Sequence, residues 1–341
     1  MRATSTQKIP ELELASLLYR GNNETIAEEL RRLAQLVGLD FQVATASNHS
    51  IDAVLTFTSH GLAPMMVQAR FHDMFASYFA RGVAQFHVRD DAADLMALMS
   101  AVGATVRGSI IGVIGAHGGA GTTTIAAWLA RLAAAEKSPV ALADFNMCSD
   151  SWNILLGIDD QATNRANIFT TQGVVLPGKL AHSLVLWNGV SILPGNRIAV
   201  DSASGEQGSR AVSALSQVHA WTFIDLGVLG GAWAAQREWL KWCDVLILVT
   251  HTTPPAVESA RKKYRELEEF AHTLIVANEA KAHAQADNVA VSLNYRDVYA
   301  VRRMSHANAD LDHGVVPGDR KRSTAAKDMR RLWSIVRESV V

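Results

Sequence analysis

The chain has 341 residues, of which 49% are hydrophobic, and its 32 basic residues almost balance its 33 acidic ones. This composition excludes a disordered chain, and a formal net charge of -1 gives no global reason to expect nucleic-acid binding. Because one domain usually has about 100–200 residues, the length predicts two domains.

The cysteines and the apolar runs exclude several classes of protein. Cys148 and Cys243 lie in no CxxC or Cys/His cluster, so neither a disulfide framework nor a zinc site is expected. The opening sequence MRATSTQKIPELELASLLYR lacks a continuous apolar segment and a cleavage site, so we expect no signal peptide. No run approaches the roughly 18 apolar residues that span a bilayer. We therefore expect a cytoplasmic protein.

Residues 1–105 show an alternating strand and helix pattern. It predicts a small parallel-sheet α/β domain followed by a linker, ATVRGS, at 104–109. Apolar runs predict strands at 11–20, 41–46, 51–58 and 82–88. Helical periodicity predicts helices at 22–38 and 90–103.

Residues 106–341 contain short apolar runs separated by helical or loop segments. This pattern predicts a doubly wound, mostly parallel sheet. The expected strands are 109–116, 138–145, 220–227, 244–250 and 272–279, and a helix is expected at 123–136. The segment 183–195 differs, because Asn188-Gly189 between two β-rich pieces predicts a hairpin near the sheet edge.

The glycine-rich stretch GAHGGAGTTT, residues 115–124, joins the first of these strands to the helix. Strand, glycine loop and helix together are the setting of a phosphate-binding loop, because the loop N–H groups and the helix N-terminus face the anion. The general pattern G-x-x-x-x-G-K-[ST] fails, since Ala116 replaces its first glycine and Thr122 its lysine. A structural turn with no ligand is the alternative interpretation.

The loop resembles the deviant Walker A motif of the MinD/ParA ATPases, K-G-G-x-G-K-T-T, although both lysines are replaced. The resemblance implies a P-loop NTPase-like domain over 106–341, ATP or ADP with Mg²⁺ as ligands, and a homodimer. In the family, the first lysine reaches across the dimer and the second binds the β and γ phosphates. The implied nucleotide-binding residues are His117, Gly118, Gly119, Ala120, Gly121, Thr122, Thr123 and Thr124, with Thr123 also a magnesium ligand.

Further motifs of that family follow in order. The segment 141–159 resembles the strand that ends in D-x-D, with Asp144 as the first aspartate and Asn146 in place of the second, which makes the catalytic pair degenerate. Asp225 in FIDLG resembles the aspartate that reaches magnesium through water. Asn278 in LIVANE matches the asparagine that reads adenine, and 291–314 resembles the tail segment near the base.

The altered loop narrows the resemblance to the CpaE/TadZ branch, associated with Tad (Flp) pilus assembly, and to its septum-site-determining relatives. Members of this branch carry a receiver-like domain before the ATPase domain, which fits residues 1–105. Thr56 and Thr58 stand where a receiver has its phosphorylated aspartate, so the resemblance implies a degenerate receiver.

Each site residue also has a simpler interpretation. His117 is either a polar loop residue or a protonated cation beside phosphate, because nearby negative charge favours imidazolium. Asp144 and Asp225 could cap turns, although ligands bind at the ends of parallel strands. Asn278 could be a strand-end turn residue.

The C-terminal stretch carries an apolar stripe with basic flanks. Met329, Leu332, Trp333 and Val336 share one helical face, which favours a helix docked on the core. Peripheral membrane contact through this face is the alternative, and it is not favoured.

Three functions are compatible with these residues. The first is a nucleotide-responsive positioning factor for pilus, secretion or septum machinery, with slow or absent hydrolysis because Thr122 supplies no charge. The second is a pseudo-ATPase scaffold that binds no nucleotide. A DNA-partitioning ATPase is a weaker third, because no clear nucleic-acid interface appears in the sequence.

Overall fold

The computed structural model describes most of the chain, in two compact units, 1–106 and 107–341. The described residues are 15–44, 53–59, 62–64, 87–103, 107–146, 175, 177–195, 203–230, 233–304 and 318–340. Among them, no helix is long and apolar enough to cross a membrane.

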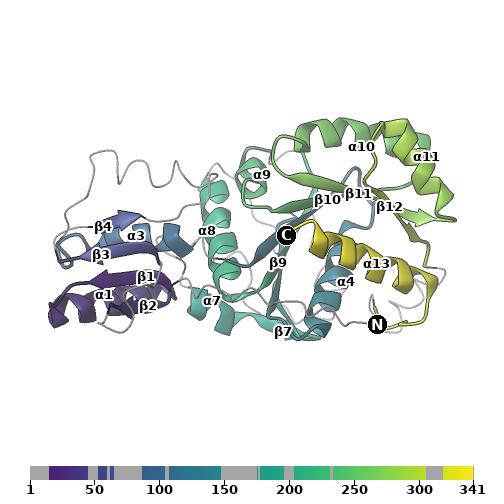
Figure 1. Cartoon of the computed structure of the whole chain (residues 1–341). Coiled ribbons are helices and arrows are strands. Elements are labelled where there is room, and N and C mark those ends of the chain that lie inside the picture. Colours follow the sequence, from purple (N-terminus) through teal and green to yellow (C-terminus); the bar gives the residue numbers. More distant parts are fainter. Residues whose placement is uncertain are drawn as a thin grey trace, which may run out of the picture. The chain divides into compact units, whose positions relative to one another are not determined.

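The first unit is an α/β structure with a four-stranded sheet in the order β2-β1-β3-β4 (Figure 1). Its elements are β1 (Ala15–Arg20), α1 (Glu24–Val37), β2 (Phe41–Val43), β3 (Ala53–Thr58), β4 (Leu62–Pro64) and α3 (Ala92–Gly103). β1 pairs in parallel with β2 and β3, as predicted. One strand departs from the predicted parallel sheet, because β4 is antiparallel to β3. The connection 59–61 is too short for a parallel crossover, which needs a dozen or more residues.

Helix α1 begins and ends close to where the sequence predicts. The Asn23 side chain accepts a hydrogen bond from the Ile26 N–H at 3.2 Å, which caps the first turn. Gly38 ends the helix in a left-handed conformation with φ of 80°. The predicted strand 82–88 lies outside the described residues over 82–86.

The second unit is built on an eight-stranded sheet in the order β12-β11-β10-β5-β9-β6-β8-β7. Its strands are β5 (Ser109–Gly115), β6 (Val140–Asp144), β7 (Val185–Trp187), β8 (Val190–Leu193), β9 (Trp221–Val228), β10 (Val245–Thr250), β11 (His272–Ala280) and β12 (Val298–Arg302). All neighbours pair in parallel except β7 and β8. The predicted doubly wound, mostly parallel sheet is therefore confirmed.

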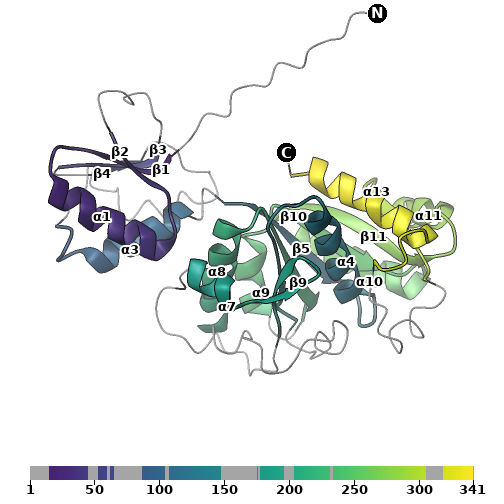
Figure 2. The same cartoon turned by 90° about the horizontal axis from the view of Figure 1, so that it is seen from below.

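Helices cover both faces of this sheet (Figures 1 and 2). They are α4 (Thr122–Ala135), α7 (Pro177–Ser183), α8 (Ala203–Val218), α9 (Trp233–Leu240), α10 (Pro254–Leu267), α11 (Ala284–Leu293) and α13 (Thr324–Glu338). Side chains of β5 alternate between the two layers, so Ile111 and Val113 pack with α4 and α13. Ile110 and Ile114 pack on the opposite face with α8, α9 and α10. A strand that is buried on both faces needs apolar residues at successive positions, which explains the continuous apolar run in the sequence.

The predicted hairpin is present at the edge of the sheet. Trp187 pairs with Val190 across the turn, and β7 is the last strand in the order. Asn188 and Gly189 have φ angles of 49° and 82°. Two successive positive φ angles are the geometry of a tight two-residue turn, for which Asn-Gly is the preferred pair.

The predicted linker 104–109 is shorter than expected, because its second half is fixed in the second unit. Ser109 begins β5, and the Arg107 side chain is 2% exposed. The Arg107 guanidinium donates to an Asp244 carboxylate oxygen at 2.8 Å and to the Trp242 carbonyl at 2.9 Å. A buried charge requires such partners, and this arginine therefore anchors the chain where β5 begins.

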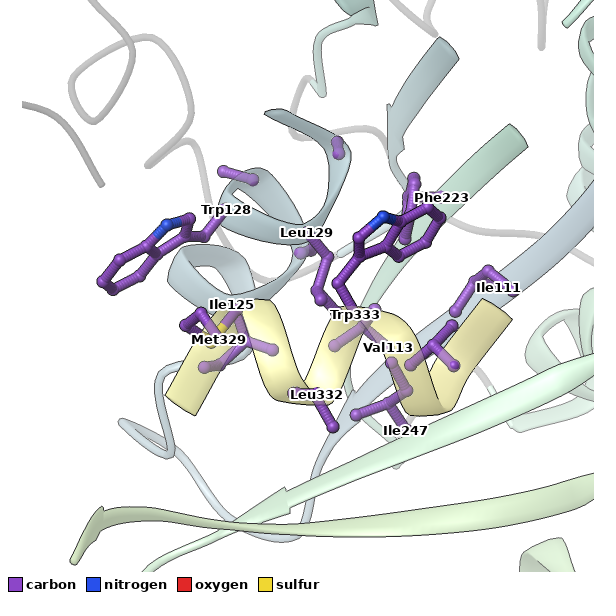
Figure 3. Close-up of a cluster of buried hydrophobic side chains, with 14 of the residues drawn as sticks. Ile111, Val113, Ile125, Trp128, Leu129, Phe223, Ile247, Met329, Leu332 and Trp333 are labelled. Carbon is purple, nitrogen blue, oxygen red and sulfur yellow. The ribbon is translucent and has the colours of Figure 1, made fainter. Parts of the chain in front are cut away.

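Helix α13 packs its apolar stripe against α4 and the sheet, as predicted (Figure 3). Met329, Leu332 and Val336 are at most 1% exposed, so this face belongs to the core. The indole N–H of Trp333 donates to Glu136 at 2.8 Å. Asp328 on the same helix accepts two bonds of 2.8 Å from the Arg302 guanidinium, which fixes the helix to β12.

Replacing Leu332 by alanine should lower the free energy of unfolding of this unit by about 2–5 kcal/mol, because a buried leucine leaves a cavity. All eight tryptophans lie after residue 107, so tryptophan fluorescence during chemical denaturation reports on this unit alone. The control Lys327→Ala, on the exposed side of the same helix, should stay within about 0.5 kcal/mol of the wild type. Equal losses in the two variants would contradict this packing.

Candidate functional site

The candidate site lies at the carboxyl ends of five neighbouring strands, in the order β11, β10, β5, β9 and β6. The glycine loop follows β5, and α4 begins at Thr122. Asp144 ends β6 and is the register partner of Asp225 in β9. Asn278 lies near the end of β11. The parallel pairing thus brings together residues that are up to 163 positions apart in the sequence, from Gly115 to Asn278.

The loop has the backbone geometry that its glycines permit. Gly119 and Gly121 have φ angles of 75° and 92°, in the left-handed region that side chains disfavour. Gly121 is the N-cap of α4 and has no side chain to occupy the first N–H groups of the helix. Free N–H groups and the positive end of a helix dipole are the features with which proteins bind anions.

Space around the glycines differs along the loop. No heavy atom of the described residues lies within 4 Å of a Cβ built at Gly118 or Gly119, so this side of the loop is open. A Cβ at Gly121 would instead collide with the Asn278 amide nitrogen. The loop is therefore accessible at its tip and tightly packed where the helix begins.

Asn278 fixes the loop to the sheet. Its side-chain amide donates to the Ala120 carbonyl at 2.8 Å, and the residue is 8% exposed. The neighbouring Glu279 has a φ of 55°, at a bulge in the pairing of β11 with β12. Asn278 is thus a structural partner of the loop. Its NH₂ group has two hydrogens, and one of them makes this bond.

Thr123 and Asp225 form the most direct link between the loop helix and a neighbouring strand. The Thr123 hydroxyl donates to an Asp225 carboxylate oxygen at 2.6 Å, and the Gly227 N–H donates to the other oxygen at 2.9 Å. Asp225 is completely buried. Hydroxyl and carboxylate oxygens are the hard ligands that Mg²⁺ prefers, so this pair fits the cation that the sequence implied.

Asp144 and Asn146 lie beside this pair. Asp144 is also fully buried, and one of its oxygens accepts a 2.9 Å bond from the Asn146 N–H. Gly227 has a φ of 59°, and a Cβ there would collide with the Asn146 side chain. The amide of Asn146 therefore packs over the turn that follows Asp225. The rest of the motif, residues 147–159, lies outside the described residues, as do 305–314 of the tail segment.

Thr122, at the lysine position of the motif, points inward. It is 7% exposed, and its hydroxyl lies 2.6 Å from a Cβ built at Gly115. A short neutral hydroxyl held against the end of β5 supplies no charge to a phosphate. Thr124, the next position but one, is partly exposed in the first turn of α4.

His117 contacts a residue that the sequence analysis did not identify. Its ring lies edge-on to His251, which directly follows β10, with 4.9 Å between ring centroids. Burial lowers the pKa of His251, the nearby His117 lowers it further, and Glu279 opposes both. The signal was available in the sequence, because His251 directly follows the apolar run 244–250, and Asp144 likewise lies at the end of the run 138–145.

Solved structures share this fold. A ParA family ATPase from Chlorobium tepidum TLS is similar over 67% of this chain and 98% of its own, with a TM-score of 0.57 and 15% identity. The septum site-determining protein MinD of Pyrococcus horikoshii OT3, complexed with Mg-ADP, is similar over 67% and 95%, with a TM-score of 0.55 and 18% identity.

A plasmid partition protein of Borrelia burgdorferi B31, bound to AMPPNP, is similar over 68% and 99%, with a TM-score of 0.54 and 15% identity. No protein-family model matches the sequence, and no curated protein is significantly similar to it. The fold of the second unit is therefore the P-loop fold of the MinD/ParA ATPases.

Replacing Gly121 by alanine should destabilise the second unit, because the left-handed backbone alone costs about 1–2 kcal/mol and the new Cβ displaces Asn278. Gly118→Ala is the matched control, since its Cβ enters open space, and it should change the unfolding free energy by less than about 0.5 kcal/mol. Denaturation followed by tryptophan fluorescence measures both. A Gly121→Ala variant as stable as Gly118→Ala would contradict the packing of Asn278 on the loop.

Proposed function

We propose that this chain is a nucleotide-responsive positioning factor that binds ATP or ADP with Mg²⁺ and hydrolyses ATP slowly or not at all. The carrying observation is the 2.6 Å bond between Thr123, in the first turn of α4, and the buried Asp225. The bond brings a hydroxyl and a carboxylate, two ligand types that Mg²⁺ prefers, beside the glycine loop. Complexes of similar folds with Mg-ADP and AMPPNP support the choice of ligand.

Different residues would bind the phosphates, the Mg²⁺ and the base. The N–H groups of 118–124 would hold the phosphates, and Thr123 would bind Mg²⁺ directly, with Asp225 acting through water. Bound Mg²⁺ would neutralise phosphate charge. Asn278 would offer its remaining amide hydrogen to the base while it holds the loop. His117 would stand beside the first glycine.

Hydrolysis would be slow for two reasons. Phosphoryl transfer needs positive charge against the γ-phosphate, and the buried Thr122 hydroxyl supplies none. It also needs a positioned water, and the neutral Asn146 organises water and magnesium less well than a carboxylate. Asp144 would keep the remaining catalytic role of this degenerate pair.

The wider role follows from the resemblance to the CpaE/TadZ branch. The chain would form a homodimer, stay in the cytoplasm or at the inner face of the membrane at a pole or septum, and recruit pilus, secretion or division proteins. Residues 1–105 would serve as a degenerate receiver-like domain, and 106–341 as the nucleotide-binding domain. Similarity to a septum site-determining protein supports a positioning role, and similarity to a plasmid partition protein keeps DNA partitioning as the weaker alternative.

The test is equilibrium binding of labelled ATP in the presence of Mg²⁺, with the mass of the particle measured with and without nucleotide. Saturable binding that Thr123→Ala weakens is expected, together with a nucleotide-dependent rise in mass. Absence of binding at about 1 mM nucleotide would leave the protein as a scaffold that acts through protein contacts alone.

Restoring the lysine should strengthen nucleotide binding. Thr122→Lys adds one charge-assisted bond to phosphate, and affinity should rise by about 10- to 100-fold. Thr124→Lys, two residues further along the helix, is the matched control for added charge and should give a smaller rise. Equal gains in both variants would show that a lysine at position 122 does not reach the phosphate.

A further inference from the structure

The histidine pair at the loop joins the ends of two adjacent strands, β5 and β10. His117 follows β5, and His251 follows the adjacent β10. The His251 backbone N–H donates to His117 Nε2 at 3.4 Å, and the two rings are in edge contact. The pair therefore ties the first part of the loop to β10, as Asn278 ties its last part to β11.

These bonds determine the tautomer of His117. Since Nε2 accepts a hydrogen bond, it carries no proton, and the ring proton resides on Nδ1. Nδ1 lies 2.9 Å from the Gly118 carbonyl oxygen and so donates to it. In this arrangement both ring nitrogens of His117 are bonded to backbone groups.

The Nδ1 bond also orients the loop. Peptide groups are planar and trans, so the carbonyl of Gly118 and the N–H of Gly119 point in opposite directions. Because the carbonyl faces the His117 ring, the Gly119 N–H faces away from it. His117 thereby fixes the direction of the Gly119 backbone donor.

On the basis of the proposed function, we propose that His117 and His251 form a proton-linked part of the phosphate site, so that binding of the nucleotide polyphosphate takes up a proton on this pair. A proton added at Nε2 of His117 ends its acceptance from His251 and turns that nitrogen into a donor. The imidazolium then supplies one positive charge to the site, where both lysines of the motif are missing.

Charged groups and burial around the pair act on its protonation in opposite directions. Glu279, at the end of β11, is the acidic group that acts on His251, and Arg303 after β12 lies 4.0 Å from Glu279. α10 begins at Pro254, so the positive end of its dipole lies three residues after His251 and disfavours a second positive charge. Asp225 lies in β9, on the other side of β5, and accepts a hydrogen bond from the Thr123 hydroxyl. Burial already holds the pKa of His251 below its ordinary value.

The sign of the pH dependence follows. An anion beside the pair favours imidazolium and raises its pKa in the complex above that in the free protein. Between these two values the complex holds more protons than the free protein, so affinity is highest at low pH and falls as pH rises. For one linked proton, the dissociation constant rises by at most about tenfold per pH unit.

The experiment measures Mg-ATP binding to the full chain at saturating Mg²⁺ and constant ionic strength, from about pH 6 to about pH 8. Calorimetry in buffers of different ionisation enthalpy counts the protons taken up. The wild type should lose several-fold affinity over this range, with net proton uptake. His117→Gln and His251→Gln should each flatten the dependence and reduce the uptake, because glutamine does not titrate.

His272→Gln is the matched control, since His272 begins the strand β11 whose opposite end carries Asn278. It should keep the wild-type pH dependence, and the comparison between variants also removes any titration of the nucleotide. Binding that is independent of pH, or a pH dependence that survives in both loop variants, overturns this proposal and leaves the proposed function intact. Absence of Mg-ATP binding at every pH overturns both.

Discussion

The parallel pairing of β5 with β9 and β10 is the constraint on which the site depends. Parallel strands deliver their carboxyl ends to one edge of a sheet, and the central position of β5 puts the glycine loop between those of its neighbours. Thr123 can therefore reach Asp225 on one side, and His117 can reach His251 on the other. Each contact joins segments that are more than 100 residues apart in the sequence.

The loop is held by protein contacts that use no lysine. Asn278 bonds to Ala120, Thr123 bonds to Asp225, and His117 bonds to Gly118. A neutral hydrogen bond contributes about 0.5–1.5 kcal/mol, and one to a charged group about 1.5–3 kcal/mol. Such bonds fix the shape of the loop but add no positive charge. Loop shape and N–H donors support the binding of a phosphate, whereas hydrolysis also requires positive charge at the γ-phosphate. We therefore expect binding without efficient hydrolysis.

The C-terminal helix shows how one pattern can serve two environments. A stripe of Met329, Leu332, Trp333 and Val336 suits a membrane surface as well as a protein core, because both remove apolar area from water. The structure selects the core, and polar contacts fix the choice. Asp328 holds Arg302 of β12, and Trp333 reaches Glu136 at the end of α4. Membrane contact through the same face would require these contacts to break.

The sequence by itself determined the five central strands of the second unit, the helix after the glycine loop, the Asn-Gly hairpin and the order of the site motifs. These depend on local patterns such as buried apolar runs, paired turn residues and strand ends. Only the tertiary structure decided which strand ends are neighbours. It turned β4 antiparallel, fixed Arg107 against Asp244, buried Thr122 and placed His251 beside His117. Those outcomes depend on pairing between distant segments, which local periodicity does not encode.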